Sequence, residues 1–370
     1  MKIPIYKLEF DNSFITKFQE GIEEILSSDS ISESKYVRKF ESEFAKIVGC
    51  NFSVATTSCT DALAISLRAI DVRNKVVLIP SNTFVATAIA IENAGGKIQL
   101  LEIEDENFSI CPDDLSDKIS NEVGAVILVH IGGIISKNFP TIREICVDNG
   151  VPLIEDAAHA HGSKLYDEFA GSIGQIGCFS FFPTKPMTTG EGGMICTNDE
   201  SLYNKMNSMK SFGTELIEGS ITWINDQGCH SRISEITGLF GFLECLRYPS
   251  RFRQRNKLAK RYIEKLQCSE FDPVLQSGGD CSFYKFILKT EIDTQWLRDY
   301  CARENISLTG EVYKIPIHKH PLYQNKYGKV VLPVTEKVCE SHICPPLYPE
   351  LQLSEVDYIC EVLRESEKYV

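Results

Sequence analysis

The chain has 370 residues, 43% of them hydrophobic, which is enough to bury the cores of one large and one smaller domain, or of two or three domains. Its formal net charge of −13 argues against nucleic acid or an anionic membrane surface as the main partner. Its 14 cysteines include no CxxC pair, which favours reduced thiols over a disulfide framework. The chain shows neither the apolar segment of a signal peptide nor an apolar run of roughly 20 residues, so we expect a cytoplasmic protein without a membrane partner.

Two amphipathic helices are predicted near the start of the chain, over residues 14–27 and 34–48, and we expect them to pack on the main domain. From residue 51 onward, short apolar runs alternate with helical stretches. The apolar runs lie at 52–55, 76–79, 98–103, 123–130 and 151–154, and the helical stretches at 60–70, 83–93 and 139–149. This βαβ alternation predicts an α/β fold with a mainly parallel central sheet covered by helices.

Polar residues fill the turn at 56–62, between the first apolar run and a helix. The free backbone N–H groups of a helix N-terminus bind anions, and hydroxyl groups reinforce them, so the turn containing Cys59 and Thr60 is a candidate phosphate site. An ordinary helix N-cap at Ser58 or Thr60 explains the same residues equally well.

The apolar run at 151–154 leads directly into Glu155 and Asp156, with small residues and His159 following. This pattern indicates a buried parallel strand that delivers side chains to the carboxyl edge of the sheet, where open α/β sheets bind ligands. A carboxylate at that edge needs a cationic partner. A protonated pyridine nitrogen opposite Asp156 would supply one.

A further apolar run at 178–182 stops at Pro183 and places Lys185 in a loop, which a glycine-rich turn at 190–193 connects to another apolar run. A lone lysine after a strand is usually a surface residue. A desolvated lysine, however, is a nucleophile that captures aldehydes. Together with Asp156 it forms the pair that enzymes use to bind the aldehyde and ring nitrogen of pyridoxal 5'-phosphate (PLP), which we predict as the cofactor.

The second half of the chain predicts a helix at 200–211, a helix ending near Arg247, and another at 251–267, with Pro249 as the break between the last two. The helix at 251–267 carries a run of cations, which indicates a solvated face, although a nucleotide diphosphate would also bind such groups. The run includes Arg251, Arg253, Arg255, Lys257, Lys260 and Arg261.

Residues 270–370 predict a smaller α+β part, with a strand at 283–288 and helices at 294–304 and 354–368. We therefore divide the chain into an N-terminal helical segment (1–50), a PLP-binding α/β domain (51–248) and a C-terminal α+β domain (249–370). Cys339, His342 and Cys344 are the only group that suggests zinc, and no fourth ligand is evident, so we predict no metal.

Six segments, in this order, resemble those of the DegT/DnrJ/StrS-type sugar aminotransferases, fold-type I PLP enzymes of the aspartate aminotransferase superfamily that aminate nucleotide-linked ketosugars. They are Ser58 to Leu63, Pro80 to Thr87, Glu155 to Gly162, Phe179 to Lys185, Ser231 to Glu235, and Pro316 to Pro321. Each segment alone is a weak signal. Together they follow the family's order, and the resemblance extends over nearly the whole chain.

By this resemblance, Lys185 holds the cofactor and moves the proton during catalysis, while Asp156 keeps the ring nitrogen protonated. The other implied cofactor residues are Cys59, Thr60 and Ser180 at the phosphate, Phe84 stacked on the ring, and His159 beside the ring. The family usually has glycine in place of Cys59, so phosphate binding depends on whether this position needs a positive φ angle. Phe84 also fits a core phenylalanine at a helix start.

The resemblance further implies a homodimer with shared active sites, in which the segment 228–232 reaches the cofactor phosphate of the partner subunit. His230 stands where the family has asparagine and keeps a hydrogen-bond donor, although it could instead only cap the following helix. Arg232, His318 and His320 are then candidates for substrate binding. The two histidines flanked by prolines also fit fixed polar groups of a loop.

The sequence thus predicts an aminotransferase that moves an amino group from an amino acid, glutamate by resemblance, to a nucleotide-linked 3- or 4-keto-deoxysugar. Its expected role is bacterial surface-polysaccharide or related amino-sugar biosynthesis. Two alternatives are a PLP-dependent sugar dehydratase of the same fold and a non-catalytic regulator that binds PLP or a sugar nucleotide. Family relatives that dehydrate replace the lysine by histidine, so Lys185 favours amination.

Overall fold

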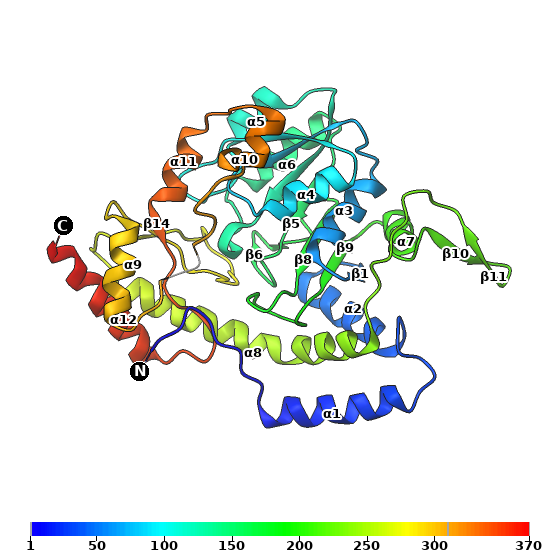
Figure 1. Cartoon of the computed structure of the whole chain (residues 1–370), viewed down its shortest axis with the longest axis horizontal. Helices are drawn as coiled ribbons and strands as arrows, with labels where there is room; N and C mark the ends of the chain where they lie inside the picture. The colour runs from blue at the N-terminus through cyan, green and yellow to red at the C-terminus, as the bar shows by residue number, and fades with distance from the viewer. Residues whose placement is uncertain (1, 309–310, 370) are drawn as a thin grey trace.

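In the computed structural model, which describes residues 2–308 and 311–369, a seven-stranded sheet forms the centre of the larger part of the molecule (Figure 1). The strand order is β1-β9-β8-β5-β4-β2-β3. The strands are β1 (Phe52–Thr56), β2 (Val76–Pro80), β3 (Lys97–Leu101), β4 (Val123–Val129), β5 (Leu153–Asp156), β8 (Ile176–Ser180) and β9 (Gly193–Thr197). The strands from β8 to β3 are parallel, whereas β9 runs antiparallel to both neighbours. The prediction of a mainly parallel α/β sheet is confirmed.

Helices cover both faces of this sheet, as continuous apolar strands require. Along β4, Ile127 belongs to a core shared with α3 and α4, and the next residue, Leu128, belongs to a core shared with α2 and α6. The covering helices are α3 (Cys59–Ala69), α4 (Val85–Asn93), α5 (Pro112–Lys118), α6 (Phe139–Asp148) and α7 (Glu200–Met209). The strand ends of β5 and β8 therefore lie at one edge of a sheet that is buried on both sides.

The N-terminal helices α1 (Asn12–Leu26) and α2 (Lys35–Val48) pack against the long helix α8 (Glu235–Lys265) (Figure 1). The buried carboxylate of Glu235 accepts hydrogen bonds from the backbone N–H groups of Ser34, Tyr36 and Val37, at 2.7, 2.7 and 3.1 Å. These donors belong to the start of α2, which has no partners for them within the helix. One carboxylate therefore caps α2 and fixes it to α8.

Helix α8 corrects the prediction that Pro249 separates two helices, because it runs through Pro249 without a break. An internal proline removes one backbone hydrogen bond and costs about 3 kcal/mol, so tertiary contacts on both sides must stabilise the helix. The Tyr248 hydroxyl donates to the carbonyl of His161 at 2.6 Å, and Arg251 pairs with Glu350 at 2.6 Å. The expected domain boundary at residue 249 consequently falls inside one helix.

The C-terminal part has its own hydrophobic core, formed by the second half of α8 together with α9 and α12. Its elements are α9 (Thr294–Arg303), α10 (Pro321–Tyr327), α11 (Pro333–Glu340), α12 (Leu353–Ser366) and the short strands β12 (Asp272–Pro273), β13 (Leu288–Lys289) and β14 (His342–Ile343). The strand predicted at 283–288 is reduced to β13. The carbonyl groups at 282–284 bind the side chain of Arg255 instead of a neighbouring strand.

A hairpin of β10 (Thr214–Ile217) and β11 (Ser220–Trp223), which the sequence analysis did not predict, projects away from the body of the molecule (Figure 1). Its apolar side chains are exposed, with Leu216 at 73%, Ile221 at 80% and Trp223 at 71%. Apolar side chains gathered on a projecting element are typical of a surface that another protein covers.

Neither a membrane-spanning helix nor a metal-binding group of three side chains is found in the part of the chain that the structure describes. Both ring nitrogens of His342, the centre of the suggested zinc group, already have partners. Nδ1 lies 2.7 Å from the Val338 carbonyl, and Nε2 accepts the backbone N–H of Val312 at 3.1 Å.

Candidate active site

A cavity of about 320 Å³ opens at the carboxyl ends of β5 and β8. Asp156 closes β5, Ser180 closes β8, and the turn from Ser58 to Thr60 begins α3 after β1. The loops after β5 and β8 contribute further side chains. The structure thereby brings together seven of the residues chosen from the sequence: Cys59, Thr60, Phe84, Asp156, His159, Ser180 and Lys185.

Asp156 is 7% exposed, and its carboxylate has two hydrogen-bond donors. The Thr87 hydroxyl donates to Oδ2 at 2.8 Å, and the backbone N–H of Ala158 donates to Oδ1 at 3.2 Å. Burial raises the pKa of Asp156, and these two bonds and the charge of Lys185 only partly oppose this effect. The site therefore holds a carboxylate in a fixed orientation and lacks enough positive charge to balance it.

The N-terminus of α3 lies at the other end of the cavity. The Ser58 side chain caps α3 by accepting the backbone N–H of Asp61 at 3.1 Å, which confirms the N-cap interpretation of this turn. Cys59 is the first residue of α3 and does not adopt a positive φ angle, so cysteine fits a position that is usually glycine in the family. Opposite it, a Cβ atom on Gly193 would lie 2.3 Å from the Ser58 backbone, so only glycine allows β9 to approach this turn.

Lys185 is half-buried, and its Nζ lies over the ring of Tyr284, 4.6 Å from the ring centre. The Tyr284 hydroxyl lies 3.1 Å from the Oγ1 of Thr184, the residue before Lys185. Burial alone would raise the pKa of Tyr284, but the positive charges of Lys185 and Lys285 and the Thr184 hydrogen bond outweigh it, so the pKa is lowered. Tyr284 was missed because its segment predicted a strand and nothing in its spacing indicated a site.

His159 lies between two tyrosines. Its ring stacks on Tyr284 with centres 4.1 Å apart, and its Nε2 lies 3.1 Å from the hydroxyl of Tyr313. Burial, followed by the charge of Lys185, lowers the pKa of His159 well below its usual value, so the ring is neutral. Its Nδ1 is buried and has no hydrogen-bond partner among the described residues. Tyr313, like Tyr284, was not predicted as a cavity residue.

Phe84 is 55% exposed, which contradicts the alternative of a core phenylalanine. It stands directly before α4, and its ring lies nearly parallel to that of Tyr313, with centres 5.9 Å apart. Both rings line the cavity. They provide flat apolar surfaces of the kind that bind a planar heterocycle.

His230 and Arg232 do not line the cavity of their own chain. The exposed ring of His230 stacks on Phe212 at 5.2 Å, and the Arg232 guanidinium lies 5.1 Å from the centre of the same ring. His230 does not cap α8, since Ser234 is the N-cap and accepts the backbone N–H of Thr237 at 3.1 Å. That alternative for His230 is wrong, and the side chain remains available at the surface.

The structure contradicts the expectation that His318 binds substrate. Its ring is fully buried, Nδ1 lies 2.7 Å from the Ser81 hydroxyl, and Nε2 lies 3.1 Å from the carboxylate of Glu336. These contacts match the alternative of a fixed loop residue. His320 is half-buried at the start of α10 and does not line the cavity.

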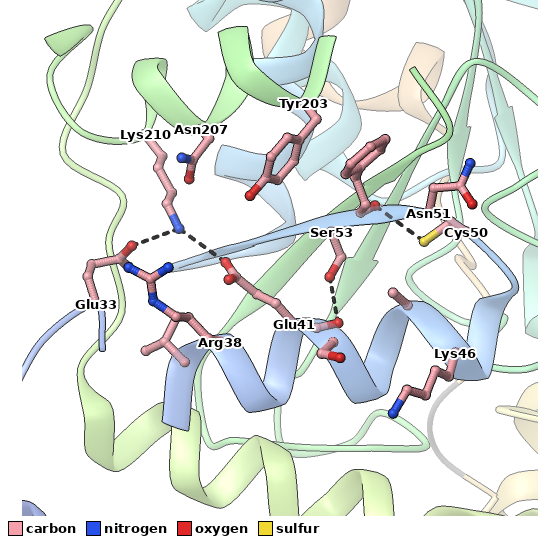
Figure 2. A pocket seen from close by; sticks show the side chains of 14 residues that line it. Glu33, Arg38, Glu41, Lys46, Cys50, Asn51, Ser53, Tyr203, Asn207 and Lys210 are labelled. Atoms are coloured by element: carbon pink, nitrogen blue, oxygen red, sulfur yellow. Dashed lines mark hydrogen bonds and ion pairs between the residues drawn. The ribbon is translucent and has the colours of Figure 1, made fainter. Parts of the chain in front are cut away.

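A second cavity, of about 500 Å³, lies between α2, β1 and α7 (Figure 2). Buried Lys210 pairs there with Glu33 at 2.9 Å and with Glu41 at 3.2 Å, and burial raises the pKa of Glu41. The backbone carbonyl of Lys210 accepts the N–H of Ser231 at 2.9 Å. The Lys210 cation is thus neutralised within the cluster, and the backbone of the same residue anchors the segment that carries His230. We therefore assign this region a structural role.

The sequence model of the DegT/DnrJ/EryC1/StrS aminotransferase family matches residues 13–364. The chain is 29% identical to a GDP-perosamine synthase of Escherichia coli O157:H7, over 98% of each chain. It is 26% identical to a dTDP-3-amino-3,4,6-trideoxy-alpha-D-glucose transaminase of Micromonospora megalomicea subsp. nigra, over 97% of each. The solved PLP form of Spr1654 from Streptococcus pneumoniae superposes with a TM-score of 0.92 at 22% identity, over 100% of both chains.

Proposed function

Because the chain belongs to the DegT/DnrJ/EryC1/StrS aminotransferase family, we propose that it uses PLP to move an amino group from an amino acid to a nucleotide-linked ketosugar. The observation that carries this proposal is the placement of Asp156 and Lys185 in one cavity of about 320 Å³. When bound, PLP supplies an aldehyde that reacts with amines and a ring that accepts electrons.

The cavity has the chemistry that PLP requires. A protonated ring nitrogen would balance the buried carboxylate of Asp156, whose pKa burial raises. The N-terminus of α3 and the Ser180 hydroxyl suit a phosphate group, and the rings of Phe84 and Tyr313 suit a flat pyridine. The protonated nitrogen, the phosphate and the ring of PLP would thus each contact a protein group of suitable charge or shape.

Two side chains carry the chemistry. The Lys185 amine would hold the aldehyde end of the cofactor through Nζ, and the same amine, when free, would move the proton at the reacting carbon. Asp156 would orient the ring and keep its nitrogen protonated by accepting a hydrogen bond from the ring N–H, and the bonds from Thr87 and Ala158 hold the carboxylate in place for that task.

A basic mouth beside Lys185 supports a nucleotide-linked substrate. We define it by Lys7, Arg251 and Lys285, three of the cations that line it. Arg251 is paired with Glu350 and Lys7 with Glu9, whereas no ion pair of Lys285 is found among the described residues. A diphosphate would supply that partner. GDP- and dTDP-linked sugars appear in the names of the relatives, and we propose the same class of substrate here.

The exposed hairpin and His230 support a homodimer with shared sites. Leu216, Ile221 and Trp223 form an apolar surface on the hairpin, and His230 lies exposed at its base, outside its own cavity. In a dimer, the second copy would cover this surface, and His230 would reach the phosphate end of the partner's cavity.

The test of the central assignment is chemical. Purified protein should be yellow, and borohydride should bleach the visible band while fixing the cofactor to Lys185, because an imine is reducible. Peptide mapping that finds the pyridoxyl mass on another lysine would contradict the proposal. A screen of nucleotide-ketosugars against the amino form of the cofactor, followed by the return of the visible band, identifies the substrate.

The shared site is tested by mixing inactive Lys185→Ala protein with inactive His230→Ala protein. A reassorted dimer with shared sites carries both changes in one cavity and neither in the other, so activity should partly return. No recovery, with subunit exchange confirmed by mass spectrometry and both variants folded, would mean that His230 does not serve the partner's cavity.

A further inference from the structure

Tyr284 contacts the two side chains that flank the reacting end of the cavity. One ring holds the Nζ of Lys185 at 4.6 Å and the ring of His159 at 4.1 Å, and its hydroxyl reaches Thr184 at 3.1 Å. The Tyr284 ring is therefore placed to contact the Lys185 amine when that amine is free. Tyr284 is itself positioned by contacts of its backbone with Arg255, which does not line this cavity.

Arg255 holds the turn that carries Tyr284. Its side chain is 5% exposed and donates to three successive carbonyl groups: Nε to Ser282 at 3.0 Å, and Nη2 to Phe283 at 2.6 Å and to Tyr284 at 3.0 Å. No carboxylate pairs with Arg255 among the described residues, and burial lowers its pKa to about 10.

This clamp secures a backbone shape that the turn would not adopt alone. Phe283 has a φ angle of 44°, a left-handed conformation that is unfavourable for a large side chain and persists only where surrounding contacts determine it. The Ser282 hydroxyl also donates to the carbonyl of His159 at 2.5 Å. The same turn therefore positions both Tyr284 and the histidine that stacks on it.

We propose that Arg255 and Tyr284 are positioning residues for Lys185: Arg255 fixes the turn 282–284, and the face of Tyr284 holds Nζ whenever that amine is not bound to the cofactor. The proposal rests on the proposed function. When a donor amine takes the place of the Lys185 amine on the cofactor, Nζ would have to stay close to the reacting carbon in order to move its proton. An aromatic face attracts the ammonium form and keeps it there.

The test uses cofactor-free protein, so it is independent of activity. Acetic anhydride modifies only the free amine, and mass spectrometry gives the acetylation rate of Lys185 relative to that of exposed Lys257. Without the aromatic face, Tyr284→Leu should raise this ratio at neutral pH by about three- to thirtyfold. Tyr284→Phe keeps the face and should stay within about twofold of the unchanged protein.

The acetylation ratio of Lys185 to Lys257 at alkaline pH shows whether the substitution changes the protonation of Lys185 or only its exposure to the reagent. When all lysines are amines, the Tyr284→Leu protein should match the unchanged one. An increase that persists there would mean that the substitution only opens the site, and it would overturn the proposal, as would an unchanged ratio at neutral pH.

The clamp is tested by Arg255→Lys, because an ammonium cannot donate to three carbonyl groups in the fixed geometry of a guanidinium. It should raise Lys185 acetylation as Tyr284→Leu does, whereas Arg253→Lys, on the exposed side of the same helix, should not. An unchanged ratio in folded Arg255→Lys protein refutes the clamp.

In the loaded enzyme, Tyr284→Leu should lower kcat more than it raises the donor KM, and Tyr284→Phe should restore kcat. Borohydride labelling away from Lys185 would refute the proposed function and leave the acetylation result standing.

Discussion

Replacing Asp156 by asparagine removes one charge from the cavity and leaves its shape. The side chain is 7% exposed and bonded to Thr87 and Ala158. The Thr87 hydroxyl also lies 2.8 Å from the Thr83 hydroxyl, so it can turn and accept a hydrogen bond from the new amide. We therefore expect Asp156→Asn protein to fold and to keep some affinity for PLP.

The expected loss of activity follows from the missing charge. An opposite charge in contact shifts a pKa by about 1 to 3 units, so without Asp156 the ring nitrogen keeps its proton in about tenfold to thousandfold fewer molecules at neutral pH. Since the protonated ring accepts the electrons, kcat/KM for the amino acid should fall by about the same factor. The remaining activity should rise as pH falls, because solvent then supplies the proton.

Stability should change in the opposite direction. Burial raises the pKa of Asp156 in the folded protein, so the folded state keeps a proton that the unfolded chain has lost above about pH 3.9. Stability is therefore lost as pH rises from that value through the raised folded pKa. Asparagine avoids this loss, and cofactor-free Asp156→Asn protein should melt no lower than the unchanged protein at pH 7. Near-normal turnover without a new pH dependence, or a clearly lower melting temperature, would refute this reasoning.

Three further changes test other parts of the structure. Lys285→Ala should raise the KM for a nucleotide sugar about tenfold, as expected for one lost charge-assisted bond, with kcat little changed. Lys257→Ala is the matched control. An unchanged KM in Lys285→Ala protein would mean that Lys285 does not bind the substrate. Glu235→Gln should lower the free energy of unfolding in urea by about 1 to 2 kcal/mol, because an amide replaces a carboxylate that accepts three N–H groups; no change would mean that the cap contributes nothing. Burial lowers the pKa of His342 to about 4. The free energy of unfolding should therefore fall by up to about 3 kcal/mol as pH falls from about 6.5 to 4, because the unfolded chain takes up a proton that the buried ring does not. In urea titrations at each pH, His342→Gln protein should lack this contribution to the pH dependence.

The sequence predicted the strand ends and their chemistry because those signals are local. An apolar run that ends in acids places Asp156 at the carboxyl edge of the sheet, and a run that ends at Pro183 places Lys185 in the adjoining loop. Parallel pairing of β5 with β8 then brings the two ends together. Neither step needs knowledge of the rest of the chain.

The features that the sequence did not reveal depend on contacts between distant segments. Arg255 lies in a run of cations that predicts a solvated face, and only the turn 282–284 explains why this one is buried. Pro249 stays helical because Tyr248 and Arg251 bind other segments. The same dependence hid Tyr284, whose position is set by a residue almost 30 places earlier.

Cys59 shows how a departure from a family pattern is resolved by local geometry. As the first residue of α3, with Ser58 as the N-cap, it has no positive φ angle, so its backbone N–H is presented as a glycine would present it. Cys59→Gly should therefore leave PLP affinity within about threefold and lower the free energy of unfolding by about 0.5 to 1 kcal/mol, the backbone entropy of glycine. Fluorescence titration with PLP and urea denaturation measure the two quantities. A gain in affinity of tenfold or more would show that the cysteine side chain, and not the backbone, limits the phosphate end of this cavity.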